Sequence, residues 1–191
     1  MTDTVLVTGG FGLVGSATVR RLAELGRTVV VADLGTPANR EAQAELPPGV
    51  TVRWVDLTDT EQTAALVADV APAVIIHLAA IIPPGIYKNR SLARTVNVDA
   101  TANLVKIAES QPEPPRFVQA SSNAVFGSRN PHRATGPVTA DMPMKHSDLY
   151  SAHKAQAEEI VRTSSLPWVV LRLGGVLSTD PKALPFSADA L

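Results

Sequence analysis

Six short runs of apolar and β-branched residues alternate with longer amphipathic stretches from one end of the sequence to the other. The runs lie at residues 4–8, 28–32, 51–55, 74–78, 116–120 and 168–172. Most are apolar throughout, which predicts strands buried on both faces. The stretches at about 12–25, 38–46, 60–70, 90–110 and 149–164 have helical periodicity. This order predicts an α/β fold, a doubly wound parallel sheet of the Rossmann type whose ligand lies at the carboxyl ends of the strands.

Length and composition restrict the class of protein. A chain of 191 residues with 45% hydrophobic residues accommodates one soluble globular domain. The net charge of -1 provides no basic field for nucleic acid or an anionic membrane, so neither is an expected partner. No apolar run approaches the roughly 20 residues that span a bilayer. Because no signal peptide precedes the first strand either, we expect a cytoplasmic protein.

Cysteine and histidine usage argues against a metal site. The sequence has no cysteine, which excludes disulfides, thiolate ligands and cysteine nucleophiles. Its four histidines, His77, His132, His146 and His153, do not follow metal-ligand spacings. We therefore predict no metal, a structural role for His77 inside an apolar strand end, and a solvent-facing or supporting role for His153.

A glycine-rich segment, TGGFGLVG at Thr8–Gly15, joins the first strand to the first helix. Gly10, Gly12 and Gly15 fit the G-x-G-x-x-G spacing, and Gly9, Gly12 and Gly15 fit the variant T-G-x-x-G-x-x-G. Glycine permits a tight turn and close approach of the backbone to a pyrophosphate, while the helix N-terminus attracts the anion. An ordinary tight turn is the alternative, but the flanking strand and helix favour a dinucleotide site.

The second strand ends in Asp33. A carboxylate there can accept hydrogen bonds from the adenosine ribose and repel a 2′-phosphate, which predicts NAD rather than NADP as the cofactor. A strand-terminal aspartate that only caps a turn is the alternative. The nearest downstream cation, Arg40, is too remote in sequence to reverse this preference.

Five further motifs follow in order along the chain. They are DLTD (56–59), HLAA (77–80), NVDATANLVKIA (97–108), SSNAVFG (121–127) and YSAHK (150–154). Together with the glycine turn, they resemble the extended short-chain dehydrogenases/reductases, the NAD-dependent epimerase/dehydratase family that includes the UDP-glucose 4-epimerases. The resemblance covers about residues 4–177. The sequence departs from the family pattern at Ala100, where glycine is usual, and at Phe126, where tyrosine is usual.

The resemblance implies a set of cofactor contacts. Asp56 and Leu57 would bind adenine, and Ala79 and Ala80 would line the cofactor. Asn97 would support this region, although a helix cap is an ordinary role for asparagine near a helix start. The full set of predicted cofactor-binding residues is Gly9, Phe11, Gly12, Leu13, Val14, Gly15, Asp33, Asp56, Leu57, Leu78, Ala79, Ala80, Asn97, Ala120, Tyr150 and Lys154.

Tyr150 and Lys154 are four residues apart, so they share one face of a helix. A cation beside a phenol stabilises the phenolate, so we expect the pKa of Tyr150 to fall from about 10 toward the working pH. The resemblance implies that Lys154 also binds the nicotinamide ribose and that Ser122 hydrogen-bonds the reacting substrate oxygen. Taken alone, the pair would be interpreted as a surface pair and the serine as a turn cap. The ordered motifs favour catalysis by Ser122, Tyr150 and Lys154, with Ser121 ranked lower.

Several segments bear on the substrate. Phe126 removes a hydroxyl near the expected substrate pocket, and the apolar segment AAIIPPG (79–85) suits a less polar substrate. The long loop at 127–148 follows a strand end, where loops are often functional. Residues 1–177 are the predicted NAD-binding domain and residues 178–191 the start of an incomplete substrate-binding region. We therefore expect NAD binding with poor turnover.

The leading prediction is an NAD-dependent oxidoreductase or epimerase with Tyr150 as acid/base. It would transfer a hydride at a secondary alcohol or ketone carbon of a sugar-like small molecule, a class that includes nucleotide sugars. An alcohol or sterol-type dehydrogenase and a carbonyl reductase stay open, as does a non-catalytic NAD-binding sensor or scaffold. The resemblance also implies a homodimer formed through the helices at about 90–110 and 149–164.

Overall fold

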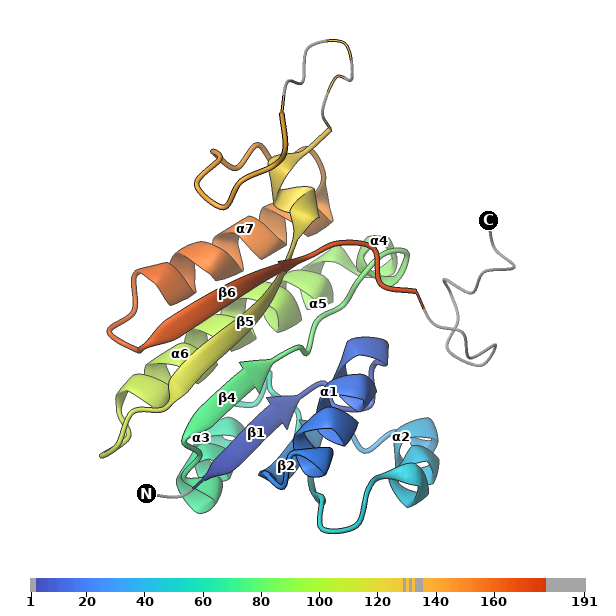
Figure 1. Ribbon diagram of the computed structural model, residues 1–191, viewed down its shortest axis with the longest axis vertical. Helices are drawn as coiled ribbons and strands as arrows, with labels where there is room; N and C mark the ends of the chain where they lie inside the picture. Colours follow the sequence, from blue (N-terminus) through green and yellow to red (C-terminus); the bar gives the residue numbers. More distant parts are fainter. Residues whose placement is uncertain (1–2, 129, 131, 133–135, 178–191) are drawn as a thin grey trace.

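A computed structural model describes residues 3–128, 130, 132 and 136–177 (Figure 1). Six strands form one sheet in the order β3-β2-β1-β4-β5-β6, and every neighbouring pair is parallel. The strands are β1 (Thr4–Thr8), β2 (Thr28–Asp33), β3 (Thr51–Trp54), β4 (Val74–His77), β5 (Arg116–Ser122) and β6 (Trp168–Leu173). The strand order reverses between β1 and β4, and ligands of doubly wound sheets bind at such a switch point. The predicted fold class is confirmed.

Helices connect successive strands, as the sequence predicts. They are α1 (Leu13–Glu24), α2 (Pro37–Ala42), α3 (Thr60–Val70), α4 (Gly85–Lys88), α5 (Arg90–Arg94), α6 (Ala100–Glu109) and α7 (Leu149–Arg162). Single 3₁₀ turns occur at η1 (Gln43–Glu45) and η3 (Asn123–Phe126). The helix predicted at 90–110 is interrupted by η2 (Thr95–Asp99), a π-helical turn of a kind that often lies near functional sites.

Two apolar clusters hold the helices against the sheet. On one face, Leu6 and Phe117 pack in a cluster that also contains residues of α3, α6 and α7, including Leu104. On the other face, Val19 of α1 packs against β1 and β2 side chains such as Val31. These five side chains are fully buried, and each such burial is worth roughly 1.5–3 kcal/mol.

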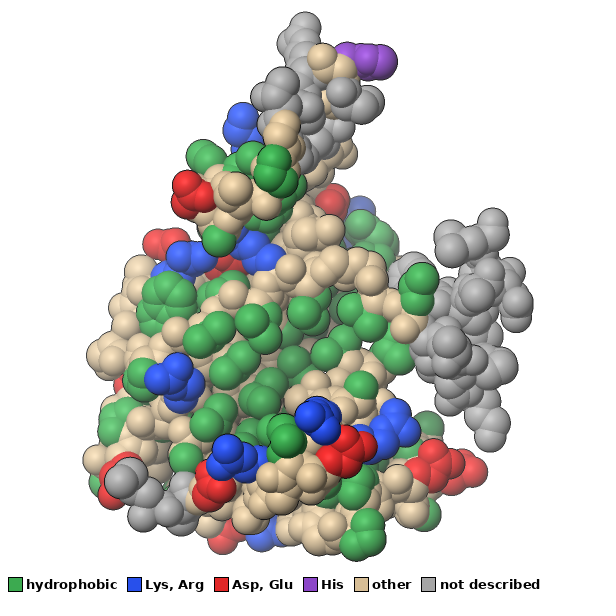
Figure 2. Space-filling model, viewed as in Figure 1, with side chains coloured by type: hydrophobic (Ala, Val, Ile, Leu, Met, Phe, Trp, Pro, Cys, Tyr) green, Lys and Arg blue, Asp and Glu red, His purple; other side chains and the backbone are tan. Residues whose placement is uncertain are grey.

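The prediction that most strands are buried holds for the four central ones, whereas the edge strands β3 and β6 are not buried on both faces. Their residues are intermediate or exposed, and Leu171 is 46% exposed. Side chains alternate along a strand, so Leu171 points away from α7, the helix that Arg172 contacts. Figure 2 shows apolar side chains at the surface over the middle of the sheet. Among the described residues, no helix is long and apolar enough to cross a membrane.

Candidate active site

A cavity of about 480 Å³ lies at the carboxyl ends of the central strands. It joins the glycine turn after β1, the segment after β4, the end of β5 and the first turns of α7. The predicted site residues that line it are Gly9, Gly12, Leu13, Val14, Gly15, Leu78, Ala80, Ala120, Ser122, Tyr150 and Lys154. The topology therefore brings both predicted halves of the site, the glycine turn and the Ser-Tyr-Lys set, to one cavity.

The glycines of the turn serve different purposes. Gly9 has a φ of +69°, and a Cβ there would lie 2.7 Å from the nitrogen of Ala79. At Gly15 a Cβ would lie 2.1 Å from the carbonyl oxygen of Gly9, so packing of the chain itself requires glycine at both positions. At Gly12, in contrast, the nearest atom would be 3.4 Å away, in van der Waals contact. The fold does not need glycine at Gly12, so the absence of a side chain there leaves cavity space for a ligand.

The helix that follows the turn begins without a side chain to cap its first N–H groups. Gly12 is the N-cap of α1 and provides no side-chain hydrogen bond, and the first turn contains no acidic residue. By contrast, the side chains of Asp59 and Asp148 cap α3 and α7. The first N–H groups of a helix need acceptors, and a phosphate supplies them. The residues present therefore fit the pyrophosphate of a dinucleotide, because the uncapped N-terminus opens into the cavity.

Asp33, the last residue of β2, links this strand to the glycine turn. Its Oδ2 accepts a hydrogen bond from the backbone N–H of Phe11 at 3.1 Å, and its Oδ1 accepts one from Leu34 at 2.8 Å. Burial raises the pKa of this carboxyl group, while these two backbone hydrogen bonds lower it. Asp33 thus caps a turn, as the alternative interpretation held. Its remaining lone pairs leave it able to accept from ribose hydroxyls.

A stack of side chains beside Asp33 was not predicted. The rings of Phe11 and Trp54 stack with centroids 5.4 Å apart, and the guanidinium of Arg40 lies 5.1 Å from the Trp54 ring. Arg40 Nε also donates to the carbonyl of Gly35 at 3.0 Å. Arg40 is therefore closer to the Asp33 turn in space than its separation in sequence suggests. Only the aromatic residue that ends β3 could have signalled this stack.

Six predicted cofactor residues do not line the cavity: Phe11, Asp33, Asp56, Leu57, Ala79 and Asn97. Asp56 accepts hydrogen bonds from the backbone and hydroxyl of Thr58, and Leu57 is buried in the core. Asn97 lies within η2 and is no helix cap. Its amide accepts from the nitrogen of Ile81 at 2.7 Å and donates to the carbonyl of Ile81 at 2.9 Å, so it holds the segment after β4.

His77 connects the glycine turn to α6 through a buried chain of hydrogen bonds. Thr101 Oγ1 donates its single hydrogen to the carbonyl of Asn97, so it must accept from His77 Nε2 at 3.0 Å. His77 Nδ1 then accepts from Thr8 Oγ1 at 2.7 Å. Burial, with a smaller effect of Lys154, lowers the pKa of His77 to about 3, so the ring is neutral. Both ring nitrogens are satisfied, which confirms the structural role predicted for His77.

Ser122, Tyr150 and Lys154 meet where α7 crosses the end of β5. The Lys154 ammonium nitrogen donates to the carbonyl of Ala120 at 2.9 Å and lies 5.8 Å from the Tyr150 ring centroid. Burial lowers the pKa of Lys154 to about 8. Ser122 Oγ accepts from the nitrogen of Ala124 at 3.2 Å, so it also caps η3.

The acidity of Tyr150 differs from the expectation. Burial raises its pKa above the ordinary value, a hydrogen-bonding interaction with Ser122 lowers it, and the charge of Asp148 raises it again. The net direction is upward, so the lowering expected from Lys154 is wrong for this structure. Burial is the physical reason, because it penalises the charged phenolate.

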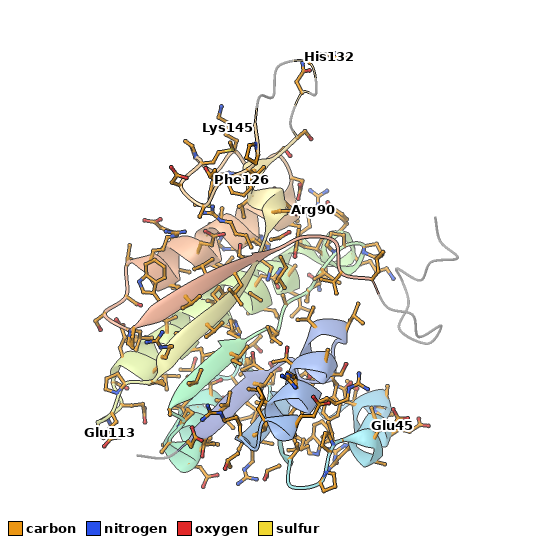
Figure 3. All side chains as sticks on the ribbon, viewed as in Figure 1. Glu45, Arg90, Glu113, Phe126, His132 and Lys145 are labelled. Atoms are coloured by element: carbon orange, nitrogen blue, oxygen red, sulfur yellow. The ribbon has the colours of Figure 1, made fainter. Side chains whose placement is uncertain are left out.

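The structure excludes one of the two roles predicted for His153. His153 is buried rather than solvent-facing, and burial lowers its pKa. Phe126 is not among the residues that line the cavity. It packs beside Ala155 in a cluster that Met142 and Met144 contact, and the guanidinium of Arg172 lies 4.7 Å from its ring centroid. Figure 3 shows Phe126 near the segment that carries Lys145, away from the glycine turn.

The part of the cavity away from the glycine turn has a mostly apolar lining. Ile82 and Pro83, from the predicted apolar segment, line it together with Leu173, Val176 and Leu177. Ile82 and Leu177 are 45% and 63% exposed. Ser121 and Asn123 also line it, and the Ser121 hydroxyl donates a hydrogen bond to Glu158 at 2.5 Å. Residues 178–191 lie outside the described residues, and no cluster of three or more potential metal ligands occurs within the described ones.

Comparisons with known proteins agree with this geometry. The model of the NAD dependent epimerase/dehydratase family matches residues 5–185. The chain is 35% identical over 167 residues to a 3-beta-hydroxysteroid dehydrogenase of Mycolicibacterium neoaurum, a match that covers 82% of this chain and 42% of that protein. It is 30% identical over 187 residues to a dTDP-glucose 4,6-dehydratase of Neisseria meningitidis serogroup B, covering 87% and 51%.

A solved structure gives the same result for the fold. The UDP-glucose 4-epimerase of Thermus thermophilus, in complex with NAD, superposes with a TM-score of 0.77 and 29% identity, covering 88% of this chain and 54% of that one. The chain spans about half the length of the relatives that it matches. The fold, the glycine turn and the family match together show that the chain belongs to the NAD-dependent epimerase/dehydratase family of extended short-chain dehydrogenases/reductases.

Proposed function

We propose that this chain binds NAD in the cavity and serves hydride transfer at a secondary alcohol or ketone carbon, with Tyr150 as the acid/base. The observation that carries the proposal is the single cavity in which an uncapped helix N-terminus and the Ser122, Tyr150 and Lys154 side chains face the same space. When bound, NAD accepts or returns a hydride at its nicotinamide ring. The family match supports NAD as the cofactor, and Asp33 supports NAD over NADP.

The chain's own residues divide the proton chemistry among them. With its pKa raised, the Tyr150 phenol is protonated at neutral pH, so it can donate a proton to a substrate carbonyl oxygen. In the opposite direction it must act as a base, which a nearby positive charge favours. Lys154, whose pKa of about 8 leaves it mostly protonated at pH 7, supplies such a charge. Ser122 would hold the substrate oxygen beside the phenol.

Two substrate classes remain in competition. The sugar-like substrate of the leading prediction agrees with relatives such as the dTDP-glucose 4,6-dehydratase. A sterol-type substrate is favoured by the lining, in which Lys154 is the one ionisable side chain besides Tyr150 among the described residues, and by the steroid dehydrogenase relative. Matched panels of UDP-sugars and hydroxysteroids separate them, with NADH production as the readout for net oxidation and product analysis as the readout for epimerisation or dehydration, in which the hydride returns to the substrate.

Cofactor binding is tested at Gly12, because an added methyl group there meets no protein atom closer than 3.4 Å. We expect Gly12→Ala to unfold at the same denaturant concentration as the parent and to bind NADH about tenfold more weakly, a loss of about 1.4 kcal/mol in calorimetric titration. Equal affinity in the two proteins would show that the cofactor does not lie over this turn.

The catalytic role is tested at Tyr150. We expect Tyr150→Phe to retain NADH affinity and to lose turnover, because the ring remains and only the proton-carrying oxygen is removed. A non-catalytic NAD sensor or scaffold would have no turnover to lose, and its NADH affinity and partner binding would be the same in both proteins. Unchanged turnover in Tyr150→Phe would exclude Tyr150 as the acid/base.

Assembly and location complete the proposal. We propose that two copies pair through the helices at about 90–110 and 149–164, as the family resemblance implies, and that the protein acts in the cytoplasm. Arg94 Nη1, at the end of α5, donates to Gln156 of α7 at 3.0 Å. These two helices are therefore in contact within one chain. Sedimentation equilibrium measures the mass in solution, and a monomer at all concentrations would contradict the pairing.

A further inference from the structure

Glu158 is a fully buried carboxylate that the proposed proton chemistry does not use. It lies two helical turns beyond Tyr150, on the same face of α7 as Lys154. Its Oε1 accepts from Ser121 Oγ at 2.5 Å and from Arg172 Nε at 2.9 Å, and its Oε2 accepts from Arg172 Nη2 at 2.8 Å. Arg162 adds a longer contact of 3.4 Å. Burying a charge costs several kcal/mol unless it is paired, and here it is paired.

The charged state of Glu158 follows from these contacts. Burial raises its pKa, but hydrogen bonds from Arg172 and Ser121, together with the charges of Arg172 and Arg162, lower it, and the net direction is downward. The bidentate contact with a guanidinium is a rigid geometry, because both groups are planar and two parallel bonds fix their orientation. The Glu158 carboxylate therefore provides a fixed acceptor beside β5.

Three consecutive residues of β5 are held by three residues of α7. The carbonyl of Ala120 accepts from Lys154, and the hydroxyl of Ser121 donates to Glu158. The next residue, Ser122, interacts with Tyr150 and lowers its pKa. Because Ser121 is the direct neighbour of Ser122, the bond to Glu158 restricts where the Ser122 hydroxyl can lie relative to the phenol.

The Arg172 partner extends the same network to the loop before α7. Its Nη1 donates to the carbonyl of Ala140 at 2.9 Å, while its other guanidinium nitrogens contact Glu158. The guanidinium also lies over the ring of Phe126, which belongs to the same apolar cluster as Ala155 of α7. One ion pair thus joins α7, β5, β6 and the loop near residue 140.

We propose that Glu158 is a positioning residue that sets the contact between Ser122 and Tyr150 by anchoring Ser121, with Arg172 as its counter-ion. The relevance of Glu158 to catalysis rests on the proposed function. The contact between Ser122 and Tyr150 does not, since it is measured through the ionisation of Tyr150, without turnover. The charged groups that face the phenol are Lys154 on α7 and Asp148 at the N-cap of α7, and both are left unchanged in the test.

The test measures the ionisation of Tyr150 directly. The sequence has two tyrosines, so Tyr87→Phe leaves Tyr150 as the single source of tyrosinate absorbance. In this background we compare the tyrosinate fraction near pH 10, the reference pKa of a phenol. We expect Glu158→Gln to lower this fraction, because losing the Ser122 interaction removes an influence that lowers the pKa of Tyr150. Ser122→Ala sets the full size of the effect, and circular dichroism at the same pH verifies folding.

The direction in which the tyrosinate fraction changes distinguishes a positioning role of Glu158 from a direct effect of its charge on the phenol. Removing the negative charge of Glu158 without moving Ser122 would lower the pKa of the phenol and increase the tyrosinate fraction. A matched control is Glu109→Gln, since Glu109 also accepts from a serine hydroxyl, Ser165 at 2.9 Å, but lies on α6. We expect this control to leave the tyrosinate fraction unchanged.

A second variant keeps the proposal testable if Glu158→Gln does not fold. Ser121→Ala removes only the hydroxyl that reaches Glu158 and leaves the pair with Arg172 intact, so it should lower the tyrosinate fraction in the same direction. A folded Glu158→Gln or Ser121→Ala with an unchanged or increased fraction, while Ser122→Ala lowers it, would overturn the proposal. Loss of turnover in Tyr150→Phe bears separately on the proposed function.

Discussion

The two ends of the cavity are built in different ways. At the glycine turn the backbone makes the contacts: Gly9 N donates to the carbonyl of Ala32 at 3.0 Å, and Gly12 N donates to the carbonyl of Gly9 at 3.2 Å. At the other end, side chains of β5, β6 and α7 contact one another, and the ionisable groups of Lys154 and Glu158 are buried. We therefore expect the first end to be sensitive to added atoms and the second to changes of charge.

The largest effect is expected at Gly15. A Cβ there would lie 2.1 Å from the Gly9 carbonyl oxygen and 2.8 Å from Gly10 Cα, both backbone atoms that cannot rotate away. We expect Gly15→Ala to lose about 3 kcal/mol of unfolding free energy, at the upper end of overpacking costs. We also expect it to lose NADH binding. Urea denaturation and calorimetric titration measure the two effects.

Gly26→Ala is the control for the glycine end. Gly26 has a φ of +72°, but a Cβ there meets no atom within 4 Å. It should cost about 1 kcal/mol for the left-handed backbone alone and leave NADH affinity unchanged. Equal losses of stability in the two variants would mean that the close packing at Gly15 is not what shapes the turn.

A smaller effect, with a defined pH dependence, is expected at Lys154. Burial lowers its pKa from 10.5 to about 8, so the cost of burying the charge is complete below pH 8 and absent above pH 10.5. Within this window the unfolded chain binds more protons, and the free energy of unfolding rises with pH. Lys154→Met lacks this group, so we expect it to be more stable than the parent by about 2 kcal/mol at pH 7.

The difference between Lys154→Met and the parent should shrink as the pH rises from 8 to 10.5, which denaturant titrations at several pH values measure. Lys106→Met, at an exposed position on α6, provides the comparison and should show no such trend. A difference that stays constant with pH would indicate that Lys154 is not buried in its charged form.

The smallest effect is expected beneath the glycine turn, in the His77 chain. Thr101→Val keeps the shape of the side chain but leaves His77 Nε2 without its acceptor, which should cost about 1–2 kcal/mol. Thr18→Val removes a similar hydroxyl, which donates to the carbonyl of Val14 at 2.8 Å and contacts no histidine. We expect Thr18→Val to change stability by less than about 0.5 kcal/mol. Thermal unfolding measures both variants. Equal losses of stability in Thr101→Val and Thr18→Val would contradict the role of Thr101 in holding His77.

The same contrast explains how much the sequence predicted. The alternation of strands and helices and the glycine turn follow from local patterns, because glycine spacing and helical periodicity act within a few residues. The grouping of Ser122 with Tyr150 and Lys154 was predicted from the family resemblance. The exposure of the edge strands could not be predicted, since coverage of a strand depends on distant segments. The packing of Phe126 could not be predicted for the same reason, because Met142 and Met144 pack against its cluster from a loop.

The charge network at the end of the cavity formed by β5, β6 and α7 could be predicted only in part. Glu158 follows Tyr150 and Lys154 at the same four-residue spacing, and Arg172 interrupts an otherwise apolar strand, so both had a signal in the sequence. No local pattern shows that these two side chains meet Ser121. The raised pKa of Tyr150 and the burial of His153 depend on tertiary packing, which periodicity alone does not give.

The most direct test of the account is a crystal structure of this chain with NADH. We predict that the pyrophosphate contacts the backbone at Gly12 and the first turn of α1, and that the nicotinamide ring lies beside Tyr150 within reach of Lys154. A cofactor bound elsewhere, or a Tyr150 phenol turned away from both Ser122 and the nicotinamide, would contradict the account.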